Sequence, residues 1–503
     1  MRLNFPATVL AFLAALWVKA IYPASSGIAD TDFYWHVTYG QWMLENRMLP
    51  PGDTFSWTFN GAPYQLTQWL GELAMGLAYN VAELDGTKAL SVLLTAVTIG
   101  FAWRGAARFV HTSMALGIAL VCNLVNLVTP MRPQLFSFAL LAASSYLVVS
   151  WLETGKRRYL MVFPPMLALW VNLHGAFVVG LLMLGLLAVG VTGESWKAGT
   201  LRQSYNRLLW VWGTLAASTL ATLVNPYGFH ALLNVVMIGG LRSSSVISEW
   251  MPVNLTTELG WFYLMNMVPF VAIMTVSGAK PRLTHGLIAG FFLTFGVLAN
   301  RQVAMCAAVM APFTAALLAR TANYQSMARD ISNPSRPMVH GVIAAVLIGS
   351  VPAIAAKGDG NWAATMNLQY PIKATDFIVA NHLDQRVLSD TLESSYLIHR
   401  RIPVFVDGRM DLYRDAFFFQ WYLASRGAPG WDVLLEEHKP SCLLLRQDMA
   451  LRQTALAGGQ WKQIFQDARY SVLVPSSSSL DEVPVTAVAY IDKDGRPLRP
   501  YMP

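Results

Sequence analysis

Long apolar segments separated by short polar turns recur along the first 356 residues of the chain. A helix needs about 20 mainly apolar residues to cross the hydrocarbon core of a bilayer, so this pattern predicts a polytopic α-helical membrane protein. We expect about eleven transmembrane helices from the spacing of these segments. The expected spans are residues 6–22, 87–103, 112–129, 135–152, 159–172, 175–193, 208–224, 260–277, 283–299, 302–319 and 338–356.

The pattern changes after the last expected span. From Lys357 onward, charged residues, prolines and mixed polar residues occur at the density of a soluble domain. Alternating strand-like and helical runs predict a small α/β domain. We therefore divide the chain into a transmembrane domain at 1–356 and an α/β domain at 357–503 with a loosely ordered tail. Its expected strands are 386–390, 402–409, 441–446, 470–475 and 486–491, and its expected helices are 393–400, 412–425 and 430–438.

A long loop, residues 23–86, connects the first two expected spans. The run DFYWHVTYGQWMLEN, which begins at Asp32, has helical spacing, and a second helix is expected from about Gln68. Amphipathic aromatic side chains are typical of the membrane interface, so we expect both helices to lie along the membrane surface. The residues that suggest this for the first helix are Phe33, Trp35, Tyr39, Trp42 and Met43.

Composition and charge agree with a membrane protein. Hydrophobic residues make up 54% of the chain and charged residues 13%, against about 25% charged residues in an average soluble domain. The net charge of +7 is spread over loops between expected spans, which favours a topology signal over a nucleic-acid surface. By the positive-inside rule the N-terminus is cytoplasmic and the α/β domain extracytoplasmic. A cleaved signal peptide is the alternative interpretation of residues 1–29.

Several classes of site find no support in the sequence. Cys122, Cys306 and Cys442 have no spacing typical of a disulfide framework or a zinc site. No glycine-rich phosphate loop follows an expected strand, so a nucleotide-driven pump is not indicated.

The polar residues that remain lie near the outer ends of the expected spans, in the first outer loop and in the turns NLHG, NPYG, SEWMP and NRQ. A transporter would instead place its ionisable groups near the bilayer midplane. The arrangement favours a site at the outer membrane face. Each of these residues alone is also explained as a helix cap or a turn residue.

Two aspartates at the start of the first outer loop suggest acid–base chemistry. Carboxylates close together push their pKa values apart, so one can remain ionised and accept a proton from a hydroxyl. Asp30 is our first choice for this base, with Asp32 or Glu72 as a second carboxylate. His36 lies four residues after Asp32 on one helix face and is expected to orient a carboxylate. The alternative for Asp32 is a helix cap.

The motifs DTDFYWHVTYGQWMLENRMLPPGDTFSWT, QWLGEL, WVNLHGAF, LVNPYGFH, ISEWMP and VFVDGRMDLY together resemble the GT-C superfamily of glycosyltransferases. This superfamily includes protein O-mannosyltransferases and the lipid A aminoarabinose transferase. The resemblance implies a polyprenyl-phosphate-linked sugar donor used on the non-cytoplasmic face. It also implies a loop acid that contacts the acceptor hydroxyl, here Asp30 or Asp32, and basic residues that hold the donor phosphate. The chain departs from the mannosyltransferases in having Thr31 between its two acids.

These observations predict a glycosyltransferase of the bacterial inner membrane. It would transfer a sugar from a polyprenyl-phosphate donor in the lipid bilayer to an extracytoplasmic glycan, lipid or protein, with no nucleic-acid partner. The planar fork of arginine suits a phosphate, so we nominate Arg301 and Arg132 for the donor phosphate. We nominate His174 for the same role. Asp407 and Arg409 follow an expected strand and are nominated to orient the acceptor; the alternative is a structural ion pair that braces a turn.

Three further points are left open by the sequence. No cofactor is expected to be required, although Mg²⁺ or Mn²⁺ held by Asp, Glu and His side chains is the alternative, as in the oligosaccharyltransferase branch. The alternative activity is that of a polymerase or ligase for a lipid-linked oligosaccharide. The non-enzymatic alternative is a protein that binds or transports glycan lipids.

Overall fold

The computed structural model describes residues 4–21, 30–331 and 369–481. It divides into two compact units. The helical unit draws on Met1–Ser25, Asp85–Val235 and Ser244–Gly358, and the mixed unit on Ser26–Leu84, Val236–Ser243 and Asp359–Pro503. The first outer loop therefore belongs to the same unit as the C-terminal segment, whereas the sequence pattern had grouped it with the spans.

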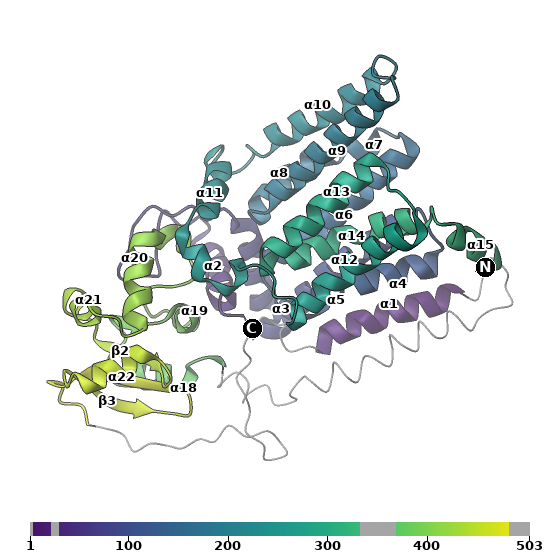
Figure 1. Ribbon diagram of the computed structural model, residues 1–503. Coiled ribbons are helices and arrows are strands. Elements are labelled where there is room, and N and C mark those ends of the chain that lie inside the picture. Colours follow the sequence, from purple (N-terminus) through teal and green to yellow (C-terminus); the bar gives the residue numbers. More distant parts are fainter. Residues whose placement is uncertain (1–3, 22–29, 332–368, 482–503) are drawn as a thin grey trace. The chain divides into compact units, whose positions relative to one another are not determined.

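The helical unit consists of apolar helices that lie side by side (Figure 1). The end of α3 (Trp69–Ala106) and the start of α11 (His230–Gly239) also belong to it. Its other helices are α1 (Asn4–Ile21), α4 (Thr112–Cys122), α5 (Leu124–Val128), α6 (Gln134–Thr154), α7 (Arg158–Met161), α8 (Phe163–Leu173), α9 (Phe177–Lys197), α10 (Tyr205–Ala221), α12 (Glu258–Ser277), α13 (Leu283–Leu298), α14 (Val303–Leu318) and α15 (Ala322–Ile331), with short 3₁₀ turns at η2 (Arg242–Val246), η3 (Ser248–Trp250) and η4 (Asn300–Gln302).

The chain is a multi-pass membrane protein. Among the described residues, 5 helices are long and apolar enough to cross a bilayer: Trp69–Ala106, Gln134–Thr154, Phe177–Lys197, Glu258–Ser277 and Asn300–Leu318. Shorter apolar helices accompany them. Each expected span up to 302–319 overlaps a described helix, and the expected span 338–356 lies outside the described residues. The number of crossings therefore stays a prediction.

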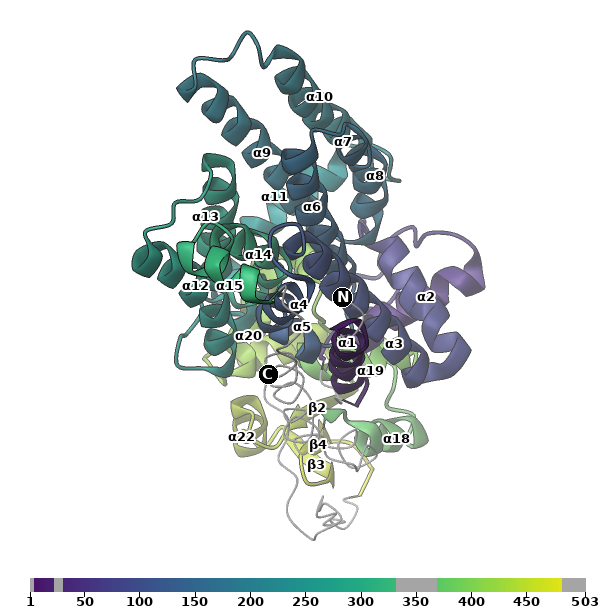
Figure 2. The same ribbon diagram turned by 90° about the vertical axis from the view of Figure 1, so that its right-hand side faces the viewer.

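Helix α14 is the centre of the helical unit. Every residue from Val303 to Leu317 is buried, as expected for a helix that is apolar on all sides and surrounded by others. It contacts α4, α6, α12 and α13, and Figure 2 shows α12, α13 and α14 next to one another. Small residues bring the helices close, since a Cβ at Gly296 would lie 2.9 Å from Cβ of Cys306.

The mixed unit joins the helices of the first outer loop to a small sheet. Its helices include α2 (Phe33–Asn46) and the first part of α3. The C-terminal elements are α18 (Ile372–Ala380), β1 (Val387–Ser389), α19 (Thr391–His399), α20 (Met410–Ser425), α21 (Trp431–His438), β2 (Cys442–Arg446), α22 (Ala450–Ala457), β3 (Trp461–Gln466) and β4 (Tyr470–Pro475).

The sheet is mixed, with strand order β1-β2-β4-β3. Strand β1 pairs with β2 in parallel, and β4 pairs with β2 and β3 in antiparallel fashion. Successive side chains of a strand point to opposite faces. Cys442 and Leu444 accordingly join one buried core with Tyr39 of α2, and Leu443 joins another with Trp421 of α20. Both faces of the sheet are therefore covered by helices.

The aromatic residues of α2 require a correction. Phe33 and Tyr39 are fully buried, and Trp35 and Met43 are nearly so, while Trp42 packs against the same core. They serve a protein core and do not form a membrane-facing surface. The second helix expected along the membrane is the first part of α3, which continues past non-helical backbone at Ala82 and Glu83. The aromatic pattern fits a lipid interface and a protein core equally well, so the pattern alone did not distinguish them.

Some C-terminal elements also differ from expectation. Residues 402–409 form isolated bridges through Val404, to Ser56 and Val387, and no named strand. Helices α18 and α22 and strand β3 were not predicted, and neither was α11. The expected strand 486–491 and most of the tail lie outside the described residues.

Helices α2 and α3 meet backbone to backbone. A Cβ at Gly76 would lie 2.5 Å from the carbonyl carbon of Gly40, and a Cβ at Gly40 would collide with the carbonyl oxygen of Glu72. The absence of a side chain at both positions is therefore required by space. This contact fixes how residues one turn earlier on each helix, His36 and Glu72, face one another.

We expect Gly76→Ala to lower the thermal unfolding midpoint of the purified protein, because backbone cannot move aside as a side chain can. Overpacking typically costs about 1–3 kcal/mol. The matched control is Gly100→Ala in the same helix, where a Cβ would meet nothing within 4 Å. Equal midpoints for the two variants would contradict the close packing of α2 and α3.

Candidate functional site

The two aspartates before α2 have different environments. Asp30 is 2% exposed, and its Oδ1 accepts the backbone N–H of Asp32 at 2.7 Å. The hydroxyl of Tyr370 donates to the main-chain oxygen of Asp30 at 2.8 Å. Asp32 is partly exposed and occupies the N-cap position of α2 without a side-chain capping bond. The capping alternative for the Asp32 side chain is therefore not what the structure shows.

The loop at Gly408 lies directly against Asp32. A Cβ at residue 408 would collide with Oδ1 of Asp32 and would lie 3.5 Å from Nε1 of Trp35. Gly408 does not have a positive φ, so glycine is needed here for space and not for conformation. Nε1 of Trp35 is buried and has no hydrogen-bond partner among the described residues. The carboxylate of Asp32 and this indole N–H thus border the same small space beside Gly408.

His36 is paired with Glu72. Its Nδ1 lies 2.9 Å from Oε1 of Glu72, and Nε2 of Gln68 donates to the same oxygen at 3.0 Å. Glu72 is fully buried, and its Oε2 has no hydrogen-bond partner among the described residues. The structure therefore joins two of the nominated residues, and the partner of His36 is an acid far along the chain.

Arg409 is the centre of a buried ionic network. Its guanidinium donates to Asp407 through Nε at 2.8 Å and Nη2 at 2.6 Å. Nη1 donates to Oδ1 of Asp53 at 2.6 Å and to the hydroxyl of Tyr39 at 2.5 Å, and the hydroxyl of Tyr413 donates to Asp407 at 2.9 Å. The side chains of Arg409, Asp53 and Asp407 are all 0% exposed. The ion pair proposed as the alternative role of Asp407 and Arg409 is present.

Asp53 was missed by the sequence analysis. It follows a Pro-Pro-Gly turn, and its carboxylate accepts the backbone N–H groups of Phe55 and Ser56, both at 3.1 Å. An aspartate at this position is explained as a turn former, so the local sequence did not predict its ion pair with Arg409. Burial opposes the charged form of Arg409, but Asp407, Tyr39 and Tyr413 together outweigh it, so the pKa of Arg409 is raised well above its usual value. Arg409 is therefore charged at physiological pH.

The residues nominated for the donor phosphate all lie in the helical unit. Arg132 lies before α6, His174 between α8 and α9, and Arg301 between α13 and α14. Arg132 forms a salt bridge with Glu249 at 2.7 Å, and the guanidinium of Arg301 lies 4.3 Å from the ring centroid of Trp250. Burial raises the pKa of Glu249, but the charges of Arg132 and Arg301 together bring it below its usual value. Two of the nominated cations therefore act on one carboxylate.

His174 belongs to the same electrostatic neighbourhood. Burial, followed by the charges of Arg301 and Arg132, lowers the pKa of His174 to about 3. Its Nδ1 accepts the backbone N–H of Ala176 at 3.2 Å and lies 3.0 Å from Oγ of Ser137. The ring is therefore neutral, and Nε2 carries its hydrogen. His174 can donate a hydrogen bond to a phosphate oxygen but brings no positive charge.

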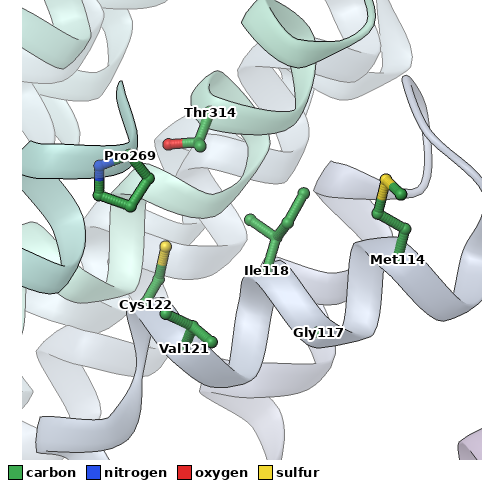
Figure 3. Close-up of a pocket in the computed structure, with 7 residues that line it drawn as sticks. All are labelled: Met114, Gly117, Ile118, Val121, Cys122, Pro269 and Thr314. Atoms are coloured by element: carbon green, nitrogen blue, oxygen red, sulfur yellow. The ribbon is translucent and has the colours of Figure 1, made fainter. Parts of the chain in front are cut away.

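A separate open pocket of about 270 Å³ lies on the helical unit. It is formed by α4 from Met114 to Cys122, by Pro269 of α12 and by Thr314 of α14 (Figure 3). None of the nominated residues lines it, and its walls are almost entirely apolar. Such walls suit hydrocarbon better than acid–base chemistry. Among the described residues no group of three or more His, Cys, Asp or Glu side chains is placed to hold a metal ion.

Comparisons with known proteins show which solved structures this chain resembles. No protein-family model matches the chain, and no curated protein matches its sequence. ArnT from Cupriavidus metallidurans, solved bound to undecaprenyl phosphate, matches with a TM-score of 0.52 and 14% identity over 94% of this chain and 99% of that chain. The oligosaccharyltransferase of Archaeoglobus fulgidus matches with a TM-score of 0.59 and 12% identity over 95% of this chain and 75% of that chain.

The chain has a GT-C-like fold. The archaeal oligosaccharyltransferase AglB from Archaeoglobus fulgidus, in complex with an inhibitory peptide and a dolichol-phosphate, also matches, with a TM-score of 0.52 and 10% identity over 90% of this chain and 72% of that chain. At these identities the GT-C-like fold is what the comparisons establish. The expected resemblance to GT-C glycosyltransferases is confirmed at the level of structure.

Arg409→Met should destabilise the mixed unit strongly, because it leaves two buried carboxylates without their counter-charge. Removing one partner of a buried ion pair costs about 3–5 kcal/mol, which corresponds to a fall in the unfolding midpoint on the order of 10 °C. Thermal unfolding of the purified protein in detergent measures this. The matched control is Arg401→Met, because Arg401 and its partner Glu45 are 46% and 58% exposed, and exposed pairs contribute about 1 kcal/mol or less. Similar shifts for both variants would refute a stabilising role of the network.

Proposed function

We propose that the chain is a membrane glycosyltransferase that moves a sugar from a polyprenyl-phosphate donor to an extracytoplasmic hydroxyl of a glycan, lipid or protein. The observation that carries this proposal is the GT-C-like fold, which extends over 94% of this chain and 99% of the ArnT chain. ArnT was solved with undecaprenyl phosphate and AglB with a dolichol-phosphate. A polyprenyl phosphate carrier is the class of ligand that these proteins share.

The proposed reaction needs a base for the acceptor. A carboxylate takes the hydroxyl proton, the hydroxyl oxygen forms a bond to the anomeric carbon, and the bond from that carbon to the donor phosphate breaks. The departing polyprenyl phosphate keeps the electron pair. A base must lie within about 3 Å of the hydroxyl oxygen whose proton it removes, so an accessible carboxylate is required.

We assign this role to the aspartates before α2. The sequence favours Asp30, but Asp30 is buried and holds the backbone of Asp32, while Asp32 is partly exposed. We therefore propose that Asp32 meets the acceptor and that Asp30 fixes its position. Glu72 and His36 hold one another, which suits a supporting role. Asp407 and Arg409 would act on the acceptor indirectly, through the position of Gly408 beside Asp32.

The donor phosphate needs hydrogen-bond donors and positive charge as the bond to the sugar breaks. We propose Arg301 and Arg132 as the charges and the neutral ring of His174 as a further donor. Glu249 competes for Arg132 through its salt bridge, so phosphate binding would involve an exchange of partners. Arginine suits this exchange because its fork of donors matches carboxylate and phosphate alike.

The orientation of the chain is part of the proposal. The excess of Lys and Arg in alternate loops supports a cytoplasmic N-terminus and an extracytoplasmic C-terminal domain in the bacterial inner membrane. The likeness to the oligosaccharyltransferase favours a second candidate activity, the transfer of a longer lipid-linked oligosaccharide. A series of donors from one sugar to several separates the two activities.

Asp32→Asn and Asp30→Asn are expected to reduce sugar transfer while the protein stays folded. Loss of a general base lowers the rate by about 10²–10⁴-fold, whereas asparagine preserves the shape of the side chain. The measurement is release of free polyprenyl phosphate by purified protein, with the thermal unfolding midpoint as the folding control. Unchanged turnover in both variants would rule out the proposed base.

Gly408→Ala tests the same carboxylate without altering it. The added Cβ would displace Oδ1 of Asp32, a side-chain atom and not backbone, so we expect the unfolding midpoint to change less than the turnover. Misplacement of a catalytic group by about 1 Å reduces rates on the order of 10²-fold. The control is Gly458→Ala, where the Cβ would make ordinary contact at 3.4 Å with the oxygen of Thr454.

We also propose that transfer needs no divalent cation, since arginine side chains can neutralise the departing phosphate. Turnover of the purified protein is therefore expected to be the same before and after treatment with EDTA. Loss of turnover that Mg²⁺ or Mn²⁺ restores would show that the metal alternative is correct.

A further inference from the structure

Three arginines gather around two tyrosines at one place in the helical unit. Nη2 of Arg108 donates to the hydroxyl of Tyr146 at 3.3 Å and to that of Tyr159 at 3.0 Å. Nη2 of Arg158 donates to the same Tyr159 hydroxyl at 3.2 Å. The guanidinium of Arg104 lies 5.9 Å from the ring centroid of Tyr146. Three arginine side chains thus share two phenol groups.

No acid of the described residues neutralises this cluster. Arg104, Arg108 and Arg158 take part in none of the salt bridges among the described residues. Glu153, which precedes Arg158 in the sequence, is bound to Arg282 at 2.9 Å. All three arginines are exposed. A guanidinium has five N–H donors, and the tyrosine hydroxyls occupy only a few of them. The cluster therefore presents oriented donors and concentrated positive charge with no internal counter-charge.

The cluster lies where membrane helices end. Arg104 is in the last turn of α3, and Arg158 and Tyr159 begin α7, while Tyr146 lies in the second half of α6, about two turns before its end. Arginine and tyrosine at such helix ends lie at the level of lipid headgroups. The residue before Arg158 makes a similar contact between an arginine and an aromatic ring: the guanidinium of Arg157 lies 4.8 Å from the ring centroid of Trp210.

We propose that Arg104, Arg108 and Arg158 form a binding site for the phosphate of an anionic phospholipid. The planar fork of arginine matches phosphate oxygens with two parallel hydrogen bonds, and Tyr146 and Tyr159 hold the three forks in place. Basic pockets between membrane helices bind anionic headgroups in this way. The position at the ends of membrane helices favours a lipid over free phosphate. This site is independent of the proposed glycosyl transfer.

Native mass spectrometry of the purified full-length protein with added phosphatidylglycerol tests the proposal. The protein is expected to bind phosphatidylglycerol at least tenfold more tightly than phosphatidylcholine. Arg104→Gln, Arg108→Gln and Arg158→Gln combined should abolish this preference. Arg108→Gln alone should weaken it, which keeps the test valid if the triple variant does not fold. Tyr159→Phe, which removes the hydroxyl shared by Arg108 and Arg158, should weaken it as well.

The matched control is Arg202→Gln, since Arg202 is also an exposed loop arginine and should leave phosphatidylglycerol binding unchanged. Equal losses in Arg202→Gln and Arg108→Gln would show a diffuse charge effect and overturn the proposal. Unchanged binding in Arg108→Gln and Tyr159→Phe would also overturn it. Millimolar inorganic phosphate should not displace the lipid, and displacement would show that the site takes free phosphate instead.

Discussion

A charge buried far from water must find its partners inside the protein, and Arg409 imposes this constraint on the mixed unit. Its partners come from segments far apart in the sequence, Asp53 in the first outer loop and Asp407 in the C-terminal part. The network can form only when both segments are in place. It thereby determines where Gly408 lies and, through the space that Gly408 leaves, where Asp32 lies. The environment of the candidate base therefore depends on ion pairs that are themselves fully buried.

The sequence was informative where one physical requirement dominates. The bilayer demands long apolar helices, and each expected span up to 302–319 overlaps a helix of the structure. Strands β2 and β4 were recognisable because they are short apolar runs buried on both faces. Strand β3, WKQIFQ, contains as many polar as apolar residues and lies at the sheet edge, so its pattern is weak. The extended run at 402–409 was mistaken for a strand because extended backbone without a ladder has the same composition.

The sequence identified which residues belong to the candidate site, but it did not identify which of them contact one another. The sequence singled out Asp30, Asp32, His36 and Glu72, but spacing along a helix suggested that His36 faces Asp32. In the structure His36 meets Glu72 on the next helix, a contact that needs the close crossing of α2 and α3. The sequence did not indicate a role for Asp53 in the site, because its position in a turn was a sufficient explanation for an aspartate there. Contacts between distant segments carry no local signal, and these contacts decide which carboxylate is exposed.

The meeting of Gly40 and Gly76 has a consequence for engineering the protein. No side chain lies between the two backbones. The helix crossing therefore cannot adjust by a change of rotamer, and it contains no gap that a larger side chain could fill. The main chain at this crossing sets how closely the two helices that carry His36 and Glu72 approach one another. Side chains around the pair can therefore be redesigned without changing the close contact of the two helices that carry it.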